Sequence, residues 1–210
     1  MKFTPELEFK GGKVRPLSLD DIDHLWNIYQ QPELPGQVIP SQKEQLARIV
    51  DYSIKMAATQ RGMMWLIEID NNILGMVSVF DWQPSSLRLM LRVDGLPELT
   101  IEQRQAALQC AMDFLAQKFH TRNFAYQWID GQPPEIQTML TNMGYKLSAT
   151  LRDAWRVGDQ GFANVLQYHF LNHQEKPKAG RLGEFENPAQ NLNKDVNSDM
   201  NATANDKGAK

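Results

Sequence analysis

Cysteine is nearly absent from this chain, and no apolar run is long enough to suggest a membrane span. Cys110 is the single cysteine among 210 residues, so no intrachain disulfide can form. It falls in an apolar helical pattern, which favours a small core residue. A span needs about 20 consecutive apolar residues. Residues 1–10 alternate charged and apolar side chains, unlike a secretory signal. We therefore expect a cytoplasmic protein with no membrane partner.

Clusters of basic residues are also missing. The chain carries 22 basic and 25 acidic residues, which give a formal net charge of -3. The basic side chains are scattered and are not interleaved with aromatic residues, as they are in many nucleic-acid-binding segments. The sequence therefore predicts no nucleic-acid partner.

Motifs for metal and nucleophilic chemistry are lacking as well. The four histidines are dispersed, have no cysteine partners and lack the short helical spacing of zinc ligands. The Gly-x-Ser-x-Gly elbow of many serine hydrolases does not occur. The sequence therefore favours neither a structural metal nor a Ser-His-Asp hydrolase.

Apolar residues make up 42% of the chain, which is enough for one buried core. The composition changes after about His173, where Asn, Lys, Asp, Gly and Ala become frequent and large apolar residues become sparse. We predict one domain over residues 1–173 and a disordered tail over residues 174–210. A solvated tail is favoured over a docking segment at Leu182 and Phe185.

Local signals predict two helices after a first strand. Val14 to Leu17 reads as a short strand that ends or lies at an edge, because Pro16 cannot donate a ladder hydrogen bond. Ser18 is a helix cap, followed by acidic residues and by apolar residues at helical spacing. A proline-rich loop over residues 32–40 leads to a second amphipathic helix that opens at Ser41.

Alternating apolar residues then predict an antiparallel meander. Met63 to Ile69 and Ile73 to Phe80 flank Asn71-Asn72, a pair that tolerates the positive backbone angles of a tight turn. Leu87 to Val93 alternates in the same way and forms the third strand of the meander.

The strongest helix follows, over Thr100 to Phe119, with Thr100 and Gln103 as a capping-box pair. Further elements complete the chain: a strand at Phe124–Ile129, a short helix at Glu135–Asn142, and a hairpin of Tyr145–Val157 and Phe162–Leu171.

Several residues along this order of strands and helices stand at positions that are also marked in one known family. Gly75 follows the Asn71-Asn72 turn, and Met139 to Lys146 is a helix end with the pair Gly144-Tyr145. Leu151-Arg152 and Tyr168-His169-Phe170 follow at the spacing found in the same family. With these residues, Val14 to Asn172 resembles the GNAT acetyltransferase superfamily, nearest the branch of ribosomal-protein N-terminal acetyltransferases. The resemblance implies an α/β (α+β) GNAT fold. Its sheet would be mixed, mostly antiparallel and six- to seven-stranded, flanked by about four helices and splayed between strands 4 and 5.

The resemblance also implies acetyl-CoA as cosubstrate, held between the diverging strands Leu87 to Val93 and Phe124 to Ile129. Unpaired backbone at the split would bind the pantetheine arm like an added strand, and amides at the start of the Thr100 helix would receive the pyrophosphate. The implied cofactor-binding residues are Leu91, Arg92, Val93, Thr100, Ile101, Arg104 and Gln132.

Three positions depart from the superfamily's pattern. Relatives have closely spaced glycines before this helix, whereas this chain has Asp94 to Glu102, with three carboxylates and one proline. Pro133 stands where relatives have a cofactor-contacting asparagine, so Gln132 is carried over in its place. Leu140 stands where many members have a tyrosine acid.

Acetyl transfer to an amine needs a base to remove the ammonium proton, and a carboxylate is sufficient. Glu68 and Asp81 are the candidates near the split, and Trp82 and Trp128 are candidates for lining an acceptor pocket or for packing. The expected function is acetyl-CoA-dependent N-acetylation of a small-molecule amine or a peptide N-terminus, by a monomer or homodimer. The alternative is a catalytically silent GNAT-fold binding or regulatory module.

Overall fold

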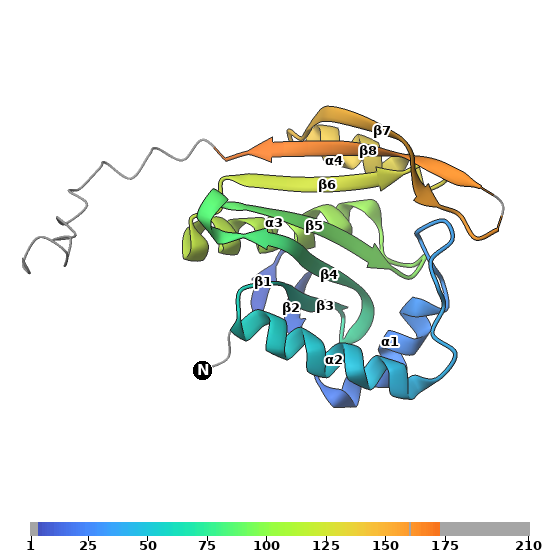
Figure 1. The fold of residues 1–210 in the computed structure, drawn as a ribbon. Helices are drawn as coiled ribbons and strands as arrows, with labels where there is room; N and C mark the ends of the chain where they lie inside the picture. The colour runs from blue at the N-terminus through green and yellow to red at the C-terminus, as the bar shows by residue number, and fades with distance from the viewer. Residues whose placement is uncertain (1–3, 160, 173–210) are drawn as a thin grey trace, which may run out of the picture. The chain divides into compact units, whose positions relative to one another are not determined.

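The computed structural model describes residues 4–159 and 161–172, which form one open eight-stranded sheet with helices on both faces (Figure 1). The predicted tail over residues 174–210 lies outside the described residues. The strands are β1 (Leu7–Phe9), β2 (Gly12–Pro16), β3 (Met63–Ile69), β4 (Asn72–Gln83), β5 (Arg88–Gly95), β6 (Asn123–Ile129), β7 (Lys146–Arg156) and β8 (Phe162–Leu171). The α-helices are α1 (Ile22–Tyr29), α2 (Lys43–Ala58), α3 (Ile101–Phe119) and α4 (Glu135–Asn142), and two 3-10 turns occur at Leu19–Asp21 and Pro84–Ser86.

The strand order is β1-β2-β3-β4-β5-β6-β8-β7. Every neighbouring pair is antiparallel except β5 and β6, which run parallel. The mixed, mostly antiparallel sheet and the four helices confirm the predicted fold class. The predicted count of six to seven strands was too low by the short strand β1. β1 has three residues, too few for alternation to be visible in the sequence.

Local signals explain most of the element boundaries. The predicted turn between β3 and β4 is present, but its left-handed residues are Asp70 and Asn71, with φ of 49° and 63°; the predicted pair Asn71-Asn72 was one residue too late, because Asn72 begins β4. The Thr100 hydroxyl accepts from the Gln103 amide while the Gln103 side chain accepts from the Thr100 amide, which confirms the predicted capping box. β2 ends at Pro16, as its missing donor requires.

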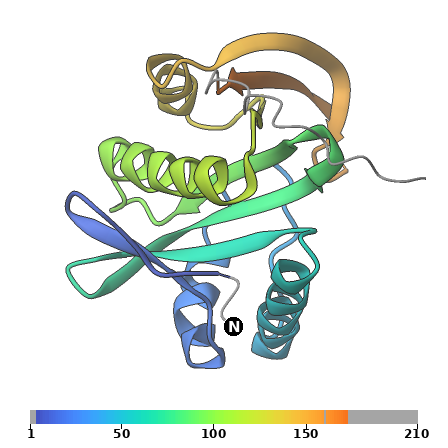
Figure 2. The same cartoon turned by 90° about the vertical axis from the view of Figure 1, so that its left-hand side faces the viewer.

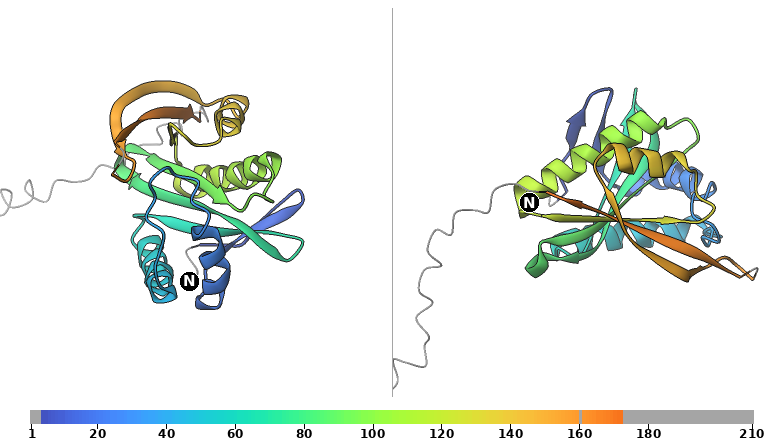
Figure 3. Two further views of the ribbon diagram at one scale, coloured as in Figure 1. Left: turned by 90° about the vertical axis from the view of Figure 1, so that its right-hand side faces the viewer. Right: turned by 90° about the horizontal axis from the view of Figure 1, so that it is seen from above.

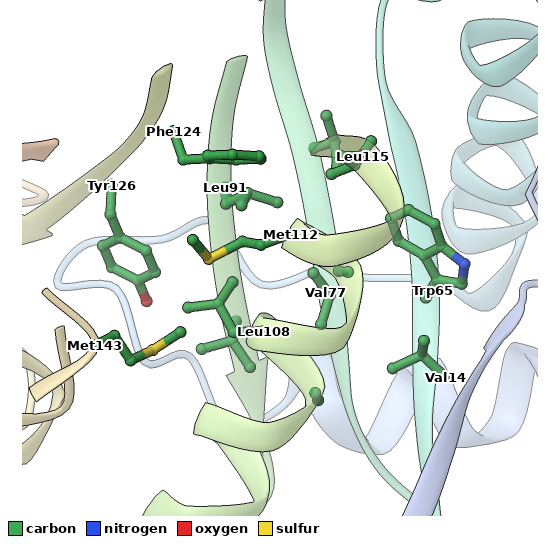
Figure 4. Close-up of a cluster of buried hydrophobic side chains, with 14 of the residues drawn as sticks. Val14, Trp65, Val77, Leu91, Leu108, Met112, Leu115, Phe124, Tyr126 and Met143 are labelled. Atoms are coloured by element: carbon green, nitrogen blue, oxygen red, sulfur yellow. The ribbon is translucent and has the colours of Figure 1, made fainter. Parts of the chain in front are cut away.

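The sheet is covered on both faces (Figure 2). Helices α3 and α4 lie on one face, and their apolar side chains join those of β3 to β6 in the larger core cluster. Figure 4 shows part of this cluster, with Trp65, Leu91, Leu108, Met112 and Phe124 among the labelled residues. Helices α1 and α2 cover the other face over a smaller cluster. No helix within the described ranges is long and apolar enough to cross a membrane.

Cys110 was predicted to be a small core residue. It lies on α3, is half-buried and packs against the larger cluster.

The two parallel strands pair along only part of their length (Figures 1 and 3). The ladder between β5 and β6 runs from Arg88 and Asn123 to Leu91 and Tyr126 and then stops. Beyond it, residues 92–95 of β5 stay paired with β4, and residues 127–129 of β6 stay paired with β8. The sheet therefore splays between β5 and β6, as the sequence predicted.

Candidate functional site

A pocket of about 630 Å³ opens where the two strands have separated. It lies between the first turn of α3 and the first turn of α4, and the α1–α2 loop forms a third wall. Its lining residues are Gln31, Pro32, Glu33, Gly95, Pro97, Leu99, Thr100, Ile101, Arg104, Gly131, Pro133, Glu135 and Ile136. The combination of a concave pocket, a helix N-terminus and one arginine is suited to a ligand with an anionic part.

Two glycines determine how closely the loop before α3 approaches the sheet. Gly75 on β4 pairs with Gly95 on β5, and the Leu99 side chain lies against both. A Cβ atom added at Gly75 would lie 2.5 Å from the Asp94 carbonyl oxygen and 2.6 Å from Leu99 Cδ2. The two glycines therefore allow Leu99 to fold back onto β4 and β5, which positions the start of α3 beside the splay.

Most of the loop's amides already have partners within the chain. The amide of Leu96 donates to the Leu74 carbonyl, and the amide of Leu99 donates to the Leu96 carbonyl. The Thr100 amide is taken by the Gln103 side chain. The loop therefore has few amides left to wrap around an anion. A ligand anion here would be bound by the amides in the first turn of α3 and by Arg104.

Arg104 is buried and fully engaged. Its guanidinium forms an ion pair with Glu33, with Nη1 to Oε2 at 2.9 Å and Nη2 to Oε1 at 2.5 Å. The same Oε1 accepts from the Gly95 amide at 2.9 Å. Burial raises the pKa of Glu33 above its usual value, although Arg104 opposes this rise. The carboxylate therefore occupies the positively charged corner of the pocket.

A second buried pair lies on the α1 face of β5. Arg92 Nε donates to Asp94 Oδ2 at 2.6 Å. Burial opposes the charge on Arg92, but Asp94 keeps the pKa of the guanidinium above its usual value. Asp94 Oδ1 is buried without a hydrogen-bond partner within the part of the chain that the structure describes.

Tyr126 is the last residue of β6 that pairs with β5, and its side chain is fully buried. Among the described residues, no hydrogen bond of good geometry reaches its hydroxyl oxygen, although the Val93 amide is near enough to oppose the rise in its pKa. Burial and the nearby Asp94 raise the pKa of the hydroxyl, so it stays protonated at neutral pH. In Figure 4 it points toward the side of the sheet that carries α3 and Met143.

The seven cofactor-binding residues predicted from the sequence fall into two groups. Thr100, Ile101 and Arg104 line the pocket together. Leu91, Arg92 and Val93 follow one another on β5 across the point of divergence, and Gln132 is buried with its Oε1 accepting from the Ile129 amide.

The two carboxylates predicted as the base lie at opposite ends of the β3–β4 ladder, and neither lines the pocket. Glu68 is near the turn and binds Arg15 at 2.7 Å and Lys13 at 3.4 Å. Its pKa is lowered, mainly by Arg15. Asp81 is at the far end of β4, is exposed, and lies 3.8 Å from Arg88. A carboxylate whose pKa is lowered accepts a proton less readily than a carboxylate at its usual pKa, so Glu68 is weakened as a base.

Trp82 and Trp128, the two candidates for lining an acceptor pocket, are both buried and packed against other parts of the chain. Trp82 is buried edge-on against Phe119, and Trp128 is buried with its indole N–H donating to the Pro133 carbonyl. Leu140 is fully buried in the larger core cluster, and Tyr145 is buried beside it with its hydroxyl on Met112 Sδ at 3.3 Å.

Sequence reasoning missed Glu33, the residue that most changes the character of the pocket. It lies in the proline-rich loop after α1, which carried no motif, and its partner Arg104 is 71 residues away. A lone carboxylate beside apolar residues and prolines was the only available signal, and it does not identify a partner.

No protein-family profile and no curated protein sequence matches the chain. Solved structures do match. A RimL ribosomal L7/L12 alpha-N-protein acetyltransferase in complex with coenzyme A aligns with a TM-score of 0.70 at 14% identity, covering 78% of this chain and 98% of that one.

Two further structures agree. A chimeric spermidine N-acetyltransferase SpeG from Vibrio cholerae and hSSAT gives a TM-score of 0.68 at 12% identity, covering 77% of this chain and 95% of that one. A GCN5-related N-acetyltransferase from Brucella melitensis gives 0.65 at 11% identity, covering 80% and 79%. The chain has the fold of the GNAT acetyltransferases.

The charge of the pocket is a poor match for the diphosphate of coenzyme A. Gly95, the last residue of β5, lines a pocket volume of about 630 Å³. The pocket's one cation, Arg104, is neutralised by Glu33, and Glu135 adds a second carboxylate to the lining. Thr100, Ile101 and Arg104, three of the predicted cofactor-binding residues, line this pocket.

Proposed function

We propose that the protein is an acetyl-CoA-dependent N-acetyltransferase that acts on the primary amine of a small metabolite or a peptide N-terminus. One observation carries the proposal: the β5–β6 ladder ends at Leu91 and Tyr126, and a pocket lined by Gly95 and Gly131 opens at the far ends of the separated strands. A sheet that served only as a scaffold would gain by pairing these strands to their ends, because unpaired backbone groups in a buried position are unfavourable.

The chain's own residues would position the cosubstrate. The edge of residues 92–95 that does not pair with β6, and whose Gly95 amide is held by Glu33, would receive the pantetheine arm as an added strand, and Thr100 with Ile101 at the start of α3 would face the diphosphate. Acetyl-CoA supplies the activated acetyl group when bound. Much of the acceleration would come from holding the amine beside the thioester.

The transfer balances without a further reactant. The amine loses a proton to a base, its nitrogen forms a bond to the acetyl carbon, the carbon–sulfur bond breaks, and the thiolate takes up a proton. Asp81 and Glu68 remain the proposed bases, and each would act through water, since neither borders the pocket. The relatives in fold named for spermidine and for a ribosomal protein support an amine or a peptide N-terminus as acceptor class.

Thermal unfolding with coenzyme A tests the proposal. A ligand at about a hundred times its dissociation constant stabilises the native state by about 2.7 kcal/mol. For a domain of this size, that raises Tm by roughly 5 to 10 °C. A panel of primary amines with acetyl-CoA, assayed for thiol release, then identifies the acceptor class.

The alternative is a GNAT-fold binding or regulatory module without acyl transfer. The Glu33 carboxylate on Arg104 and the Gly95 amide is the observation that favours it. An unchanged Tm with millimolar coenzyme A would decide for this alternative. A raised Tm without thiol release for any amine would indicate a sensor that binds the cosubstrate.

A further inference from the structure

The donors that could hold a ligand anion beside α3 are already occupied by a carboxylate of the chain itself. Glu33 binds Arg104 at two points and also accepts from the Gly95 amide. The same guanidinium donates to the carbonyl oxygens of Leu99 and Leu96 at 3.1 and 3.3 Å. The arrangement has the geometry by which proteins recognise a bound phosphate or carboxylate, with Glu33 in the place of the ligand.

The loop that carries Glu33 is anchored independently on the other side of the splay. Leu34 is buried in a cluster with Ile129, the last residue of β6, and Val165 on β8. The Trp155 indole on β7 donates to the Pro35 carbonyl oxygen at 2.6 Å. In Figure 1 this loop rises from α1 toward the β7–β8 hairpin. The Glu33 side chain could therefore leave its partners while the loop stays in place.

The ion pair is also less favourable than its distances suggest. The Glu33 and Arg104 side chains are only 12% and 9% exposed, so both charges have lost most of their water. Removing charges from water offsets much of the attraction between them. Burial accordingly raises the pKa of Glu33 even with Arg104 in contact. A multiply charged ligand anion would be a strong competitor for the same donors.

We propose that Glu33 is an internal competitor for the anion site of this pocket, and that a ligand diphosphate binds by displacing its carboxylate from Arg104 and the Gly95 amide. Glu33 thereby sets the affinity of the pocket for its anionic ligand. The identity of that ligand as coenzyme A rests on the proposed function; the displacement itself requires only a diphosphate.

Isothermal titration of Glu33→Gln with coenzyme A and, separately, with inorganic pyrophosphate tests the proposal. Glutamine keeps the shape of the side chain and removes its charge, so the variant should bind both probes about tenfold more tightly than the wild type. Glu102→Gln is the matched control. It removes the same charge from the exposed first turn of α3 without freeing a buried donor, and should change affinity by about threefold at most.

The outcomes separate this inference from the proposed function. Equal coenzyme A affinity for wild type and Glu33→Gln overturns the inference and leaves the proposed function standing. Tighter pyrophosphate binding by Glu33→Gln, with no coenzyme A binding by either protein, supports the inference and contradicts the proposed function. Failure of both probes to bind either protein contradicts both.

A measurement on the wild type keeps the proposal testable if Glu33→Gln does not fold. In a titration with inorganic pyrophosphate followed by NMR, the Gly95 amide and the Arg104 Nη–H signals should shift together as Glu33 is displaced. Saturable binding that leaves both signals unmoved would overturn the proposal.

Discussion

Arg15 joins three segments of the chain through a single side chain. From β2, its guanidinium donates twice to Asp21 before α1, at 2.7 and 2.9 Å, and once to Glu68 on β3 at 2.7 Å. Asp21 in turn accepts from the Ser18 amide. The network therefore attaches the first helix to the sheet edge.

Replacing Arg15 with Met should destabilise the fold by about 2 kcal/mol, because two carboxylates lose their shared partner in a partly buried place. The guanidinium is 22% exposed, so the loss should stay below the roughly 3 to 5 kcal/mol of a fully buried pair. Urea unfolding measures the change. Lys13→Met, which removes the more exposed cation beside Glu68, is the control and should cost no more than about 1 kcal/mol. Equal effects would contradict the assigned role of Arg15.

Asp21 gives the same network a pH dependence. Burial disfavours its charged form, but Arg15 and Ser18 outweigh burial and lower its pKa. A carboxylate with a lowered pKa contributes stability that is present above its unfolded pKa of about 3.9 and lost as the pH falls through the lower native value. Asp21→Asn should therefore lose the most stability relative to wild type near neutral pH, and the gap should narrow below about pH 4. A gap independent of pH would refute this assignment.

Tyr126 carries a buried hydroxyl that makes no hydrogen bond of good geometry with the described residues, with the Val93 amide nearby. Removing such a group removes its desolvation penalty, so Tyr126→Phe should leave the free energy of unfolding unchanged or raise it by up to about 1 kcal/mol. Tyr145→Phe, which gives up the contact with Met112 Sδ, serves as the comparison. A loss of more than about 1 kcal/mol in Tyr126→Phe alone would reveal a hydrogen bond to the hydroxyl.

At the scale of elements, β4, β5 and the start of α3 depend on the absence of a side chain at Gly75. Gly75→Ala would force the Asp94 carbonyl and Leu99 apart and should cost about 1 to 3 kcal/mol. Ser78→Ala, half-buried on the same strand, should change stability by less than about 0.5 kcal/mol. Thermal unfolding compares the two. A Gly75→Ala protein as stable as wild type would show that the loop is not held by this contact.

Elements with strong local signals could be predicted, and those that depend on distant contacts could not. The hairpin around Asn71, the Thr100 cap and the glycine at the α4 end were visible because each obeys a short-range rule. The pairing of Leu7 to Phe9 with β2 was not visible, since three residues show no periodicity. The start of α2 at Lys43 rather than Ser41 is within the usual uncertainty of helix ends.

In the candidate site, too, the residues marked by local sequence patterns could be predicted, and those brought in by distant contacts could not. Thr100 and Arg104 were found because a capped helix after a strand is a local pattern. The ion pair of Arg104 with Glu33 depends on tertiary folding, which brings a loop onto a helix 71 residues away. Charge near the diphosphate position was anticipated at Asp94 and Glu102, but the carboxylate that reaches the pocket corner comes from another segment.

At the scale of the whole molecule, two groups of strands meet along a short seam. β1 to β5 form one group and β6 to β8 the other, and the parallel ladder between them extends only from Arg88 to Leu91 on β5. Pro35 on the α1–α2 loop adds a contact to β7 across the opening. The pocket thus lies where the two groups separate, which is why its occupancy is the central question.

A crystal structure of the protein grown with coenzyme A tests that question most directly. We expect the pantetheine arm between β5 and β6 beyond Leu91 and Tyr126, with the diphosphate at Thr100 and Arg104 and the Glu33 carboxylate turned away. Coenzyme A bound elsewhere, or the two strands paired past Tyr126 with no ligand between them, would contradict this expectation.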